Sequence, residues 1–391
     1  MTFRNRHATG SLKDVILLWR IYKHYFCLFP ILRVSLIAWI QSHTISIWKW
    51  YDHPKLKTYT ITVEYSFLLQ GISVKMAYLI EANVEPPLRF KTQTSARLEV
   101  ETSRRCFWRC FINDSLAHVG MHGPRLISEH DVAIKLPMVY SDWIALDPLE
   151  PEMTLETEDL SAFLNPTELY VPSFENLGGF GHYIILIKIH SRVCDYLKSP
   201  VSTHHQLILE SALGDWHQTL PPIVRDSSNH SYLPNSSVGY LEALVLYYSI
   251  YIKLYINPFV QSIKLNFWRP EDSHGLETLM NALRHLSTLS VSFLSQPPSV
   301  SLSSPQSYVS FLEAGLVALL IVQSRCIPFD IRERADSYYR VLSNTLGSIQ
   351  FGHRLAESVL TILKKSELEE NVPMDSIVGW DLNRVIAMAK A

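Results

Sequence analysis

The stretch Arg104–His122, RRCFWRCFINDSLAHVGMH, decides how the rest of the chain is interpreted. It contains two cysteines and two histidines in the spacing C-x3-C-x7-H-x3-H, which has the letters of a zinc site. The ligands would be Cys106, Cys110, His118 and His122. The same stretch also has the apolar spacing of a helix. If it is helical, its four zinc-like residues are not expected to bind one metal ion.

Helical geometry argues against zinc because it spreads the four side chains along an axis. Residues rise by about 1.5 Å each, so His118 lies ~12 Å beyond Cys110, whereas zinc–ligand bonds are about 2.0–2.3 Å long. The residues INDSLA between the pairs contain no glycine or proline to make a turn. A zinc finger also needs about a dozen residues between its ligand pairs. We therefore predict an unbroken helix that holds no metal.

The predicted helix has one mostly apolar face that we expect to pack inward. This face contains Trp108, Phe111, Ile112, Ser115 and Val119. Cys106 and Cys110 fall on roughly the opposite side of the helix, where they could supply at most two ligands to a metal ion.

The composition of the 391 residues is that of an ordinary globular chain, with 47% hydrophobic and 18% charged residues. The 14 glycines are few for this length, which favours helices over many tight turns. Net charge is −2, without the basic excess of a stand-alone nucleic-acid binder. Five scattered cysteines fit a reducing compartment better than a disulfide framework.

Apolar residues recur mainly at spacings of three and four, which predicts an all-α chain. We expect a single large multi-helix domain at 56–365, an apolar helical extension of uncertain status at 1–55, and a charged tail at 366–391. The predicted helices are 13–28, 32–48, 61–80, 99–119, 180–197, 203–218, 238–256, 274–294, 307–325, 329–348 and 350–365. Proline is expected to end the sixth at Pro221–Pro222 and the seventh at Asn257–Pro258. The helix at 307–325 is apolar nearly all round, which predicts deep burial.

The segment Val15–Ile40 is apolar enough to suggest a membrane anchor. Charged residues and Pro30 interrupt it, and its longest uncharged stretch, Tyr25–Leu32, is about half of the ~18 residues that a span needs. We expect a buried or ill-fitting helix pair here. A membrane anchor and non-native sequence from a wrong gene start stay open as alternatives.

The residues Glu101–Ser115, ETSRRCFWRCFINDS, resemble the signature helix of the fungal-specific transcription factor domain. This domain is the regulatory middle homology region of fungal zinc-cluster activators. Its pattern runs roughly E-T-R-R-R-L-W-W-x-x-[YF]-x-x-D. The matching residues are Glu101, Thr102, Arg104, Arg105, Trp108, Phe111 and Asp114. The chain departs from the pattern at Ser103, Cys106 and Phe107.

Further motifs follow in the family's order and extend the resemblance over roughly residues 60–345. The segment His122–Pro137 resembles the family's G-R-P-x-x-I-x-x-x-D-x-x-x-x-L-P segment, with His122–Gly123 in place of its Gly–Arg pair. Its residues in register are Pro124, Ile127, Asp131, Leu136 and Pro137. Other similar elements are Gly71–Ala77, Leu213–Pro222, Tyr247–Phe259 and the helix that contains Ser304–Leu320.

The resemblance implies a nuclear, non-enzymatic transcription regulator with an all-α regulatory fold. Family activators bind DNA through an N-terminal cluster of six cysteines, but only Cys27 precedes Cys106 here. We therefore expect no cofactor in this chain, with zinc present only if a missing N-terminal cluster exists. The expected partners are a DNA-binding regulator or a second copy of the chain, with DNA contacted only indirectly. A small-molecule effector would bind between helices, and membrane binding is not expected.

No catalytic, metal-binding or DNA-binding residue is predicted. The signature residues are expected to have structural roles in the scaffold, with the arginines and the aspartate pairing with or capping neighbouring helices. They are Arg104, Arg105, Trp108, Phe111, Asp114, Pro124 and Asp131.

Two alternatives to a lone regulatory domain stay open. The chain could be a truncated zinc-cluster factor whose first exon is missing from the gene model. It could also be an all-α ligand-binding protein or enzyme that reuses this fold, associated with a membrane through residues 15–40. Enzyme motifs are weak, since LGGFGH at Leu177–His182 follows no strand, and G-x-S-x-G and H-E-x-x-H do not occur.

Overall fold

The computed structural model describes residues 70–85, 94–121, 125–137, 177–198, 203–225, 238–264, 273–294, 305–324 and 326–349. These residues are mostly helical and include no strand. Their closest approach to a sheet is an isolated parallel bridge between Val84 and Ala133. The all-α prediction is confirmed for this part of the chain. The predicted helices at 13–28, 32–48 and 350–365, and the segments 1–55 and 366–391, lie outside the described residues.

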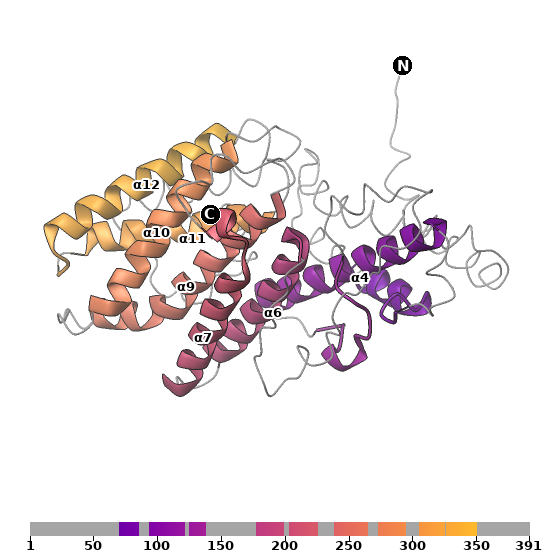
Figure 1. Ribbon diagram of the computed structural model, residues 1–391. Coiled ribbons are helices and arrows are strands. Elements are labelled where there is room, and N and C mark those ends of the chain that lie inside the picture. The colour runs from indigo at the N-terminus through magenta and orange to yellow at the C-terminus, as the bar shows by residue number, and fades with distance from the viewer. Residues whose placement is uncertain are drawn as a thin grey trace, which may run out of the picture.

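The described helices form one packed series along the chain (Figure 1). Residues 70–79 are helical and precede α4 (Thr94–Met121), the short 3-10 helix η2 (Glu129–Asp131), α6 (Gly179–Lys198), α7 (Thr203–Thr219), α8 (Pro222–Arg225), α9 (Val238–Lys264), α10 (Ser273–Leu294), α11 (Pro305–Gln323) and α12 (Phe329–Ile349). Helix α9 lies at the centre and packs against α6, α10 and α11. Helix α12 packs on α10 and α11, and α4 packs on α6 at the other end.

Most helix ends lie within a few residues of the predicted ones, but two predictions were wrong. Helix α4 begins at Thr94 and not at residue 99. Helix α9 continues through Pro258 to Lys264, although proline was expected to end it. The next two residues, Phe259 and Val260, are buried, whereas Pro258 is exposed. Burial of this apolar pair stabilises the continuation against the hydrogen bond that proline removes.

Two core helices have the length and composition of membrane spans. They are Gly239–Gln261 within α9 and Gln306–Gln323 within α11, and 78% and 83% of their apolar windows are buried inside the fold. The core helix of a globular protein passes the same test, and here both helices pack against others. Helix α11 therefore has the deep burial that its all-round apolar sequence predicts.

A buried ion pair connects these two helices. Glu313 of the apolar helix α11 pairs with Lys253 of α9, and the Ser249 hydroxyl donates a 2.8 Å hydrogen bond to the other carboxylate oxygen. Losing one partner would leave an uncompensated charge in the core, so the pair favours a single register of α11 on α9.

The backbones of α6 and α9 touch where both helices begin. A Cβ atom on Gly179 would lie 2.7 Å from the Tyr240 nitrogen and 2.9 Å from the Gly239 carbonyl carbon. A Cβ atom on Gly239 would lie 2.9 Å from the carbonyl carbon of Gly179. Side chains do not tolerate such distances from backbone, so the crossing requires glycine on both helices.

We predict that Gly179→Ala lowers the free energy of unfolding by roughly 1–3 kcal/mol, because the added methyl group forces the helices apart. Gly214→Ala is the matched control, since a Cβ atom there meets nothing within 4 Å. It should raise stability by up to about 1 kcal/mol through helix propensity. Urea unfolding measures both variants, and equal effects of the two would contradict the close crossing.

We also predict a loss of stability in mild acid from two buried histidines of α6. Burial lowers the pKa of His182 to about 4, and burial together with the Lys253 charge lowers that of His190 to about 3. Below the ordinary pKa of about 6.5 the unfolded chain binds protons that the folded chain does not, so the free energy of unfolding falls as pH falls. Each histidine should contribute a loss of about 2 kcal/mol between pH 7 and pH 5.

Urea unfolding at pH 7 and pH 5 tests this effect. His190→Gln should be less stable than wild type at pH 7, but its loss on acidification should be smaller by about 2 kcal/mol. A variant that loses as much stability as wild type between the two pH values would contradict the prediction.

Candidate functional site

The signature residues gather on α4 and face the segments that flank it. Trp108 and Phe111 are in the core, and the side chain of Arg104 has 0% exposure. Asp114 is also buried, whereas Asp131 is exposed on η2. Pro124 lies outside the described residues.

Buried charges around Arg104 join α4 to the chain before it. The Arg104 guanidinium binds both carboxylate oxygens of Glu85, with a distance of 3.1 Å from Nε to Oε2. Glu101, one turn earlier on α4, lies 3.6 Å from Arg104 Nη1 and 2.8 Å from the Nε of Arg105. Glu85 Oε2 also accepts the backbone N–H of Lys135 at 3.3 Å. The planar guanidinium of Arg104 thus positions the Glu85 carboxylate, which in turn binds the backbone of Lys135 in the segment after α4.

Asp114 and Trp108 attach the same following segment to α4. The Asp114 carboxylate accepts the backbone N–H groups of Leu126 and Ile127 at 3.0 and 2.9 Å, and also the amide of Gln70 at 3.3 Å. The indole N–H of Trp108 donates to the carbonyl oxygen of Lys135 at 2.8 Å. Burial raises the pKa of Asp114, while the N–H bonds act in the opposite direction. These contacts position backbone and leave the carboxylate enclosed.

Cys106, Cys110 and His118, three of the four zinc-like residues, lie along the unbroken helix α4. The sequence placed Cys106 and Cys110 away from the inward face, but both are buried. The helix at 70–79 reaches α4 beside Cys106, where Tyr78 packs edge-on against Phe107. Hydrogen bonding to Cys106 and burial raise the pKa of Cys110 well above its ordinary value.

His118, the histidine of the motif that the structure describes, does not join the cysteines. His118 lies 3.3 Å from Asp195 on α6, and His122 lies outside the described residues. Within the described ranges, no group of three or more His, Cys, Asp or Glu side chains could hold a metal ion.

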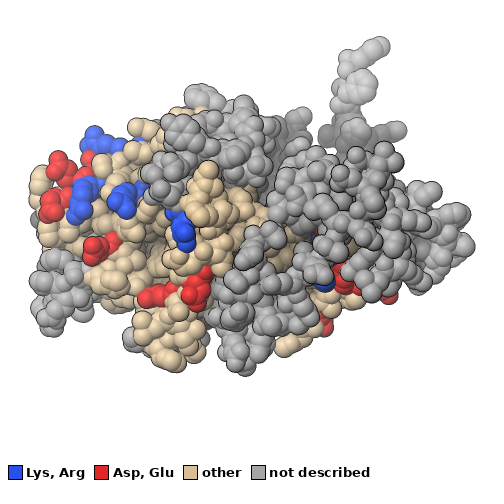
Figure 2. Space-filling model, in the orientation of Figure 1, with Lys and Arg blue, Asp and Glu red and all other residues tan. Residues whose placement is uncertain are grey.

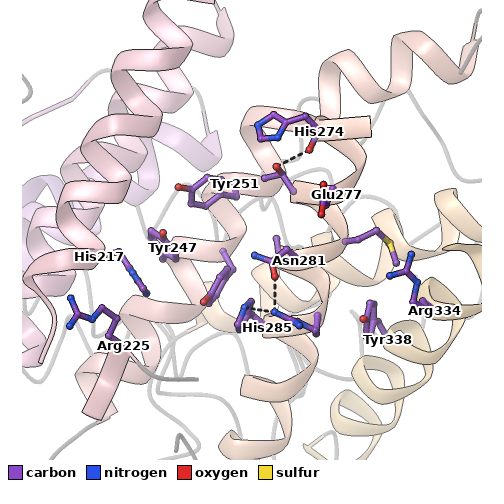
Figure 3. A pocket seen from close by; sticks show the side chains of 15 residues that line it. His217, Arg225, Tyr247, Tyr251, His274, Glu277, Asn281, His285, Arg334 and Tyr338 are labelled. Atoms are coloured by element: carbon purple, nitrogen blue, oxygen red, sulfur yellow. Dashed lines mark hydrogen bonds between the residues drawn. The ribbon is translucent and has the colours of Figure 1, made fainter. Parts of the chain in front are cut away.

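A groove of about 880 Å³ lies at the other end of the fold, and we call it the α10 groove. Exposed residues of α10 form its middle, and Figure 3 shows His217 and Arg225 on one side and Arg334 and Tyr338 on the other. It is lined by His217, Arg225, Tyr247, Tyr248, Tyr251, His274, Glu277, Thr278, Met280, Asn281, Ala282, Arg284, His285, Arg334 and Tyr338. This size is that of small-molecule sites.

Stacked aromatic rings form the wall that α9 contributes. Tyr248 stacks on His285, with ring centroids 4.4 Å apart and planes 6° apart. Tyr247 stacks on His217 at 5.1 Å and 18°. Burial raises the pKa of Tyr247, and it raises that of Tyr248 to about 12. At neutral pH these phenols are therefore uncharged, and their hydroxyl groups can donate hydrogen bonds.

The charged side chains of the groove are mostly basic. Among the described lining residues, Arg225, Arg284 and Arg334 stand beside one carboxylate, that of Glu277. Figure 2 shows basic side chains at the surface over the end of the molecule that contains α10 and α12, with acidic side chains beside them. The described lining of the groove is thus aromatic, with more guanidinium groups than carboxylates.

Sequence reasoning missed this groove. It singled out Leu213–Pro222 and Tyr247–Phe259 only as family-like elements, without a pocket. One signal was present, because Tyr247, Tyr248 and Tyr251 cluster three hydroxyl groups within five residues of a mostly apolar helix. Their partners come from α7 and α10, which the sequence does not bring together.

We predict that Asp114→Ala lowers the free energy of unfolding by roughly 2–4 kcal/mol, because it leaves two backbone N–H groups near the core without their acceptor. The control is Asp336→Ala, which removes a pair with Arg340 at the surface and should cost about 0.5 kcal/mol or less. Thermal or urea unfolding compares them. If Asp114→Ala loses no more stability than the control, Asp114 does not hold the 125–137 segment on α4.

The chain matches no protein-family model, and neither a curated protein nor a solved structure matches it significantly. The resemblance to the fungal-specific transcription factor domain therefore rests on the motifs alone.

Proposed function

We propose that this chain is a non-enzymatic regulatory protein of the transcription-regulator type, whose helical domain binds a small effector in the α10 groove. The observation that carries the proposal is the groove itself. It combines the volume of a small-molecule site with side chains from α7, α8, α9, α10 and α12. A ligand that touches several helices at once favours the arrangement in which all of its contacts are made, and so shifts the population of conformations.

The lining suits binding better than chemistry. Burial raises the pKa of both Tyr247 and Tyr248, so the two phenols stay protonated at neutral pH. The imidazole rings of His217 and His285 stack on these tyrosines, which holds them flat against the wall. An effector would therefore meet an ordered surface with fixed donors.

The ordered family-like motifs support the transcriptional part of the proposal. In this account the clamps of Arg104 and Asp114 on α4 maintain the scaffold, and the groove at the other end receives the effector. The protein would act in the nucleus and reach DNA through a DNA-binding partner or a second copy of itself.

A reporter assay tests this function. The full chain is fused to a heterologous DNA-binding module, and we expect reporter expression to differ from that of the module alone. His285→Ala removes a stacked wall of the groove and should change the response by about fivefold, the scale of a typical allosteric coupling. His130→Ala is the control, since His130 is exposed on η2 and does not line the groove.

Two outcomes would contradict the proposal. Reporter expression equal to that of the module alone would contradict a regulatory role for this chain. Equal responses of the wild-type, His285→Ala and His130→Ala fusions would separate regulation from the groove.

A further inference from the structure

We infer that the α10 groove selects a small planar organic anion, for which an aromatic carboxylate is the simplest representative. This inference rests on the proposed function, because it names the chemistry of the effector. Three features carry it: guanidinium groups that pair with no carboxylate in the described part of the chain, flat stacked rings, and the closeness of the two.

Two arginines of the groove are held by neutral acceptors. Arg225 Nη1 donates to the side-chain oxygen of Gln218 at 2.7 Å. Arg284 Nη2 donates to the side-chain oxygen of Asn281 at 2.9 Å. Neither guanidinium has a carboxylate within 4.0 Å among the residues that the structure describes. Their positive charges are thus positioned by amides without being neutralised, which leaves them able to bind an anion.

The remaining charges of the described lining offset this excess only in part. Arg334 is paired with Asp330 at 3.8 Å, so its charge is not counted in the excess. Glu277 is then the one carboxylate among the described lining residues, against the two guanidinium groups of Arg225 and Arg284. The groove therefore favours a ligand with negative charge over a neutral or cationic one of the same shape.

Arg284 brings charge and flat rings together. Its Nη2 lies 3.3 Å from His285 Nε2, and since arginine has only donors, the imidazole nitrogen must accept. His285 in turn stacks on Tyr248, with planes 6° apart. The Arg284 charge also lowers the pKa of Tyr248 against the larger effect of burial, so guanidinium and phenol are near each other.

This arrangement matches both parts of an aromatic acid. A planar ring can pack on the Tyr248–His285 face while its carboxylate is within reach of the guanidinium. Guanidinium and carboxylate form paired, charge-assisted hydrogen bonds, which fix orientation as well as affinity. The volume of about 880 Å³ leaves room for such a ligand.

The test is a calorimetric titration of the full chain with 2-naphthoate and with 2-naphthamide, which have the same ring and differ in charge. We expect 2-naphthoate to bind about tenfold more tightly, because charge-assisted hydrogen bonds are stronger than neutral ones. Arg284→Gln should lower its affinity about tenfold and remove the preference over the amide. Arg340→Gln is the control, since Arg340 is an exposed arginine of α12 that does not line the groove, and it should leave both affinities unchanged.

The outcomes separate this inference from the proposed function. Equal binding of the two compounds would overturn the anion preference while leaving an effector groove in place. Binding of neither compound, or equal losses in Arg284→Gln and Arg340→Gln, would also overturn it. The reporter assay decides the regulatory function independently, because it uses no added ligand. Unfolding curves of both variants show whether each is folded.

Discussion

The backbone contact between Gly179 and Gly239 is the constraint on which much of the fold depends. It sets the distance between α6 and α9 where both helices begin. With α6 so close, every side chain from Leu241 to Ile250 of α9 is buried. Lys253, farther along α9, pairs with Glu313 of α11, and the same carboxylate accepts a hydrogen bond from Ser249. The crossing and the ion pair thus fix α9 to two neighbours.

The same helix then supplies the wall of the α10 groove. Because α9 is held on its other sides, Tyr247 and Tyr248 have fixed positions and can act as a surface for the rings of His217 and His285. Order in the wall lowers the entropy cost of binding a rigid ligand. At the α4 end of the molecule, the buried side chains of Arg104 and Asp114 instead hold the segments before and after α4. One end of the fold is therefore closed by polar clamps, and the other presents an open, charged surface.

The sequence predicts the helices well because each depends on local spacing, and Pro221–Pro222 ends α7 as expected. It fails at Pro258, where burial of Phe259 and Val260 outweighs the local effect of proline. It also fails for the groove, whose residues come from five helices and whose stacked pairs exist only after packing. The resemblance singled out Arg104 and Asp114, yet their partners, a glutamate 19 residues away and backbone N–H groups, cannot be seen in a motif. Local pattern thus determines the elements, and tertiary contact determines the site.

Amide hydrogen exchange of the full chain with and without saturating 2-naphthoate shows where the ligand binds. If the effector occupies the α10 groove while α4 serves as scaffold, exchange slows in α8, α10 and the first half of α12, with no change in α4. Protection centred on α4 and the 125–137 segment, without any in α10, would contradict it.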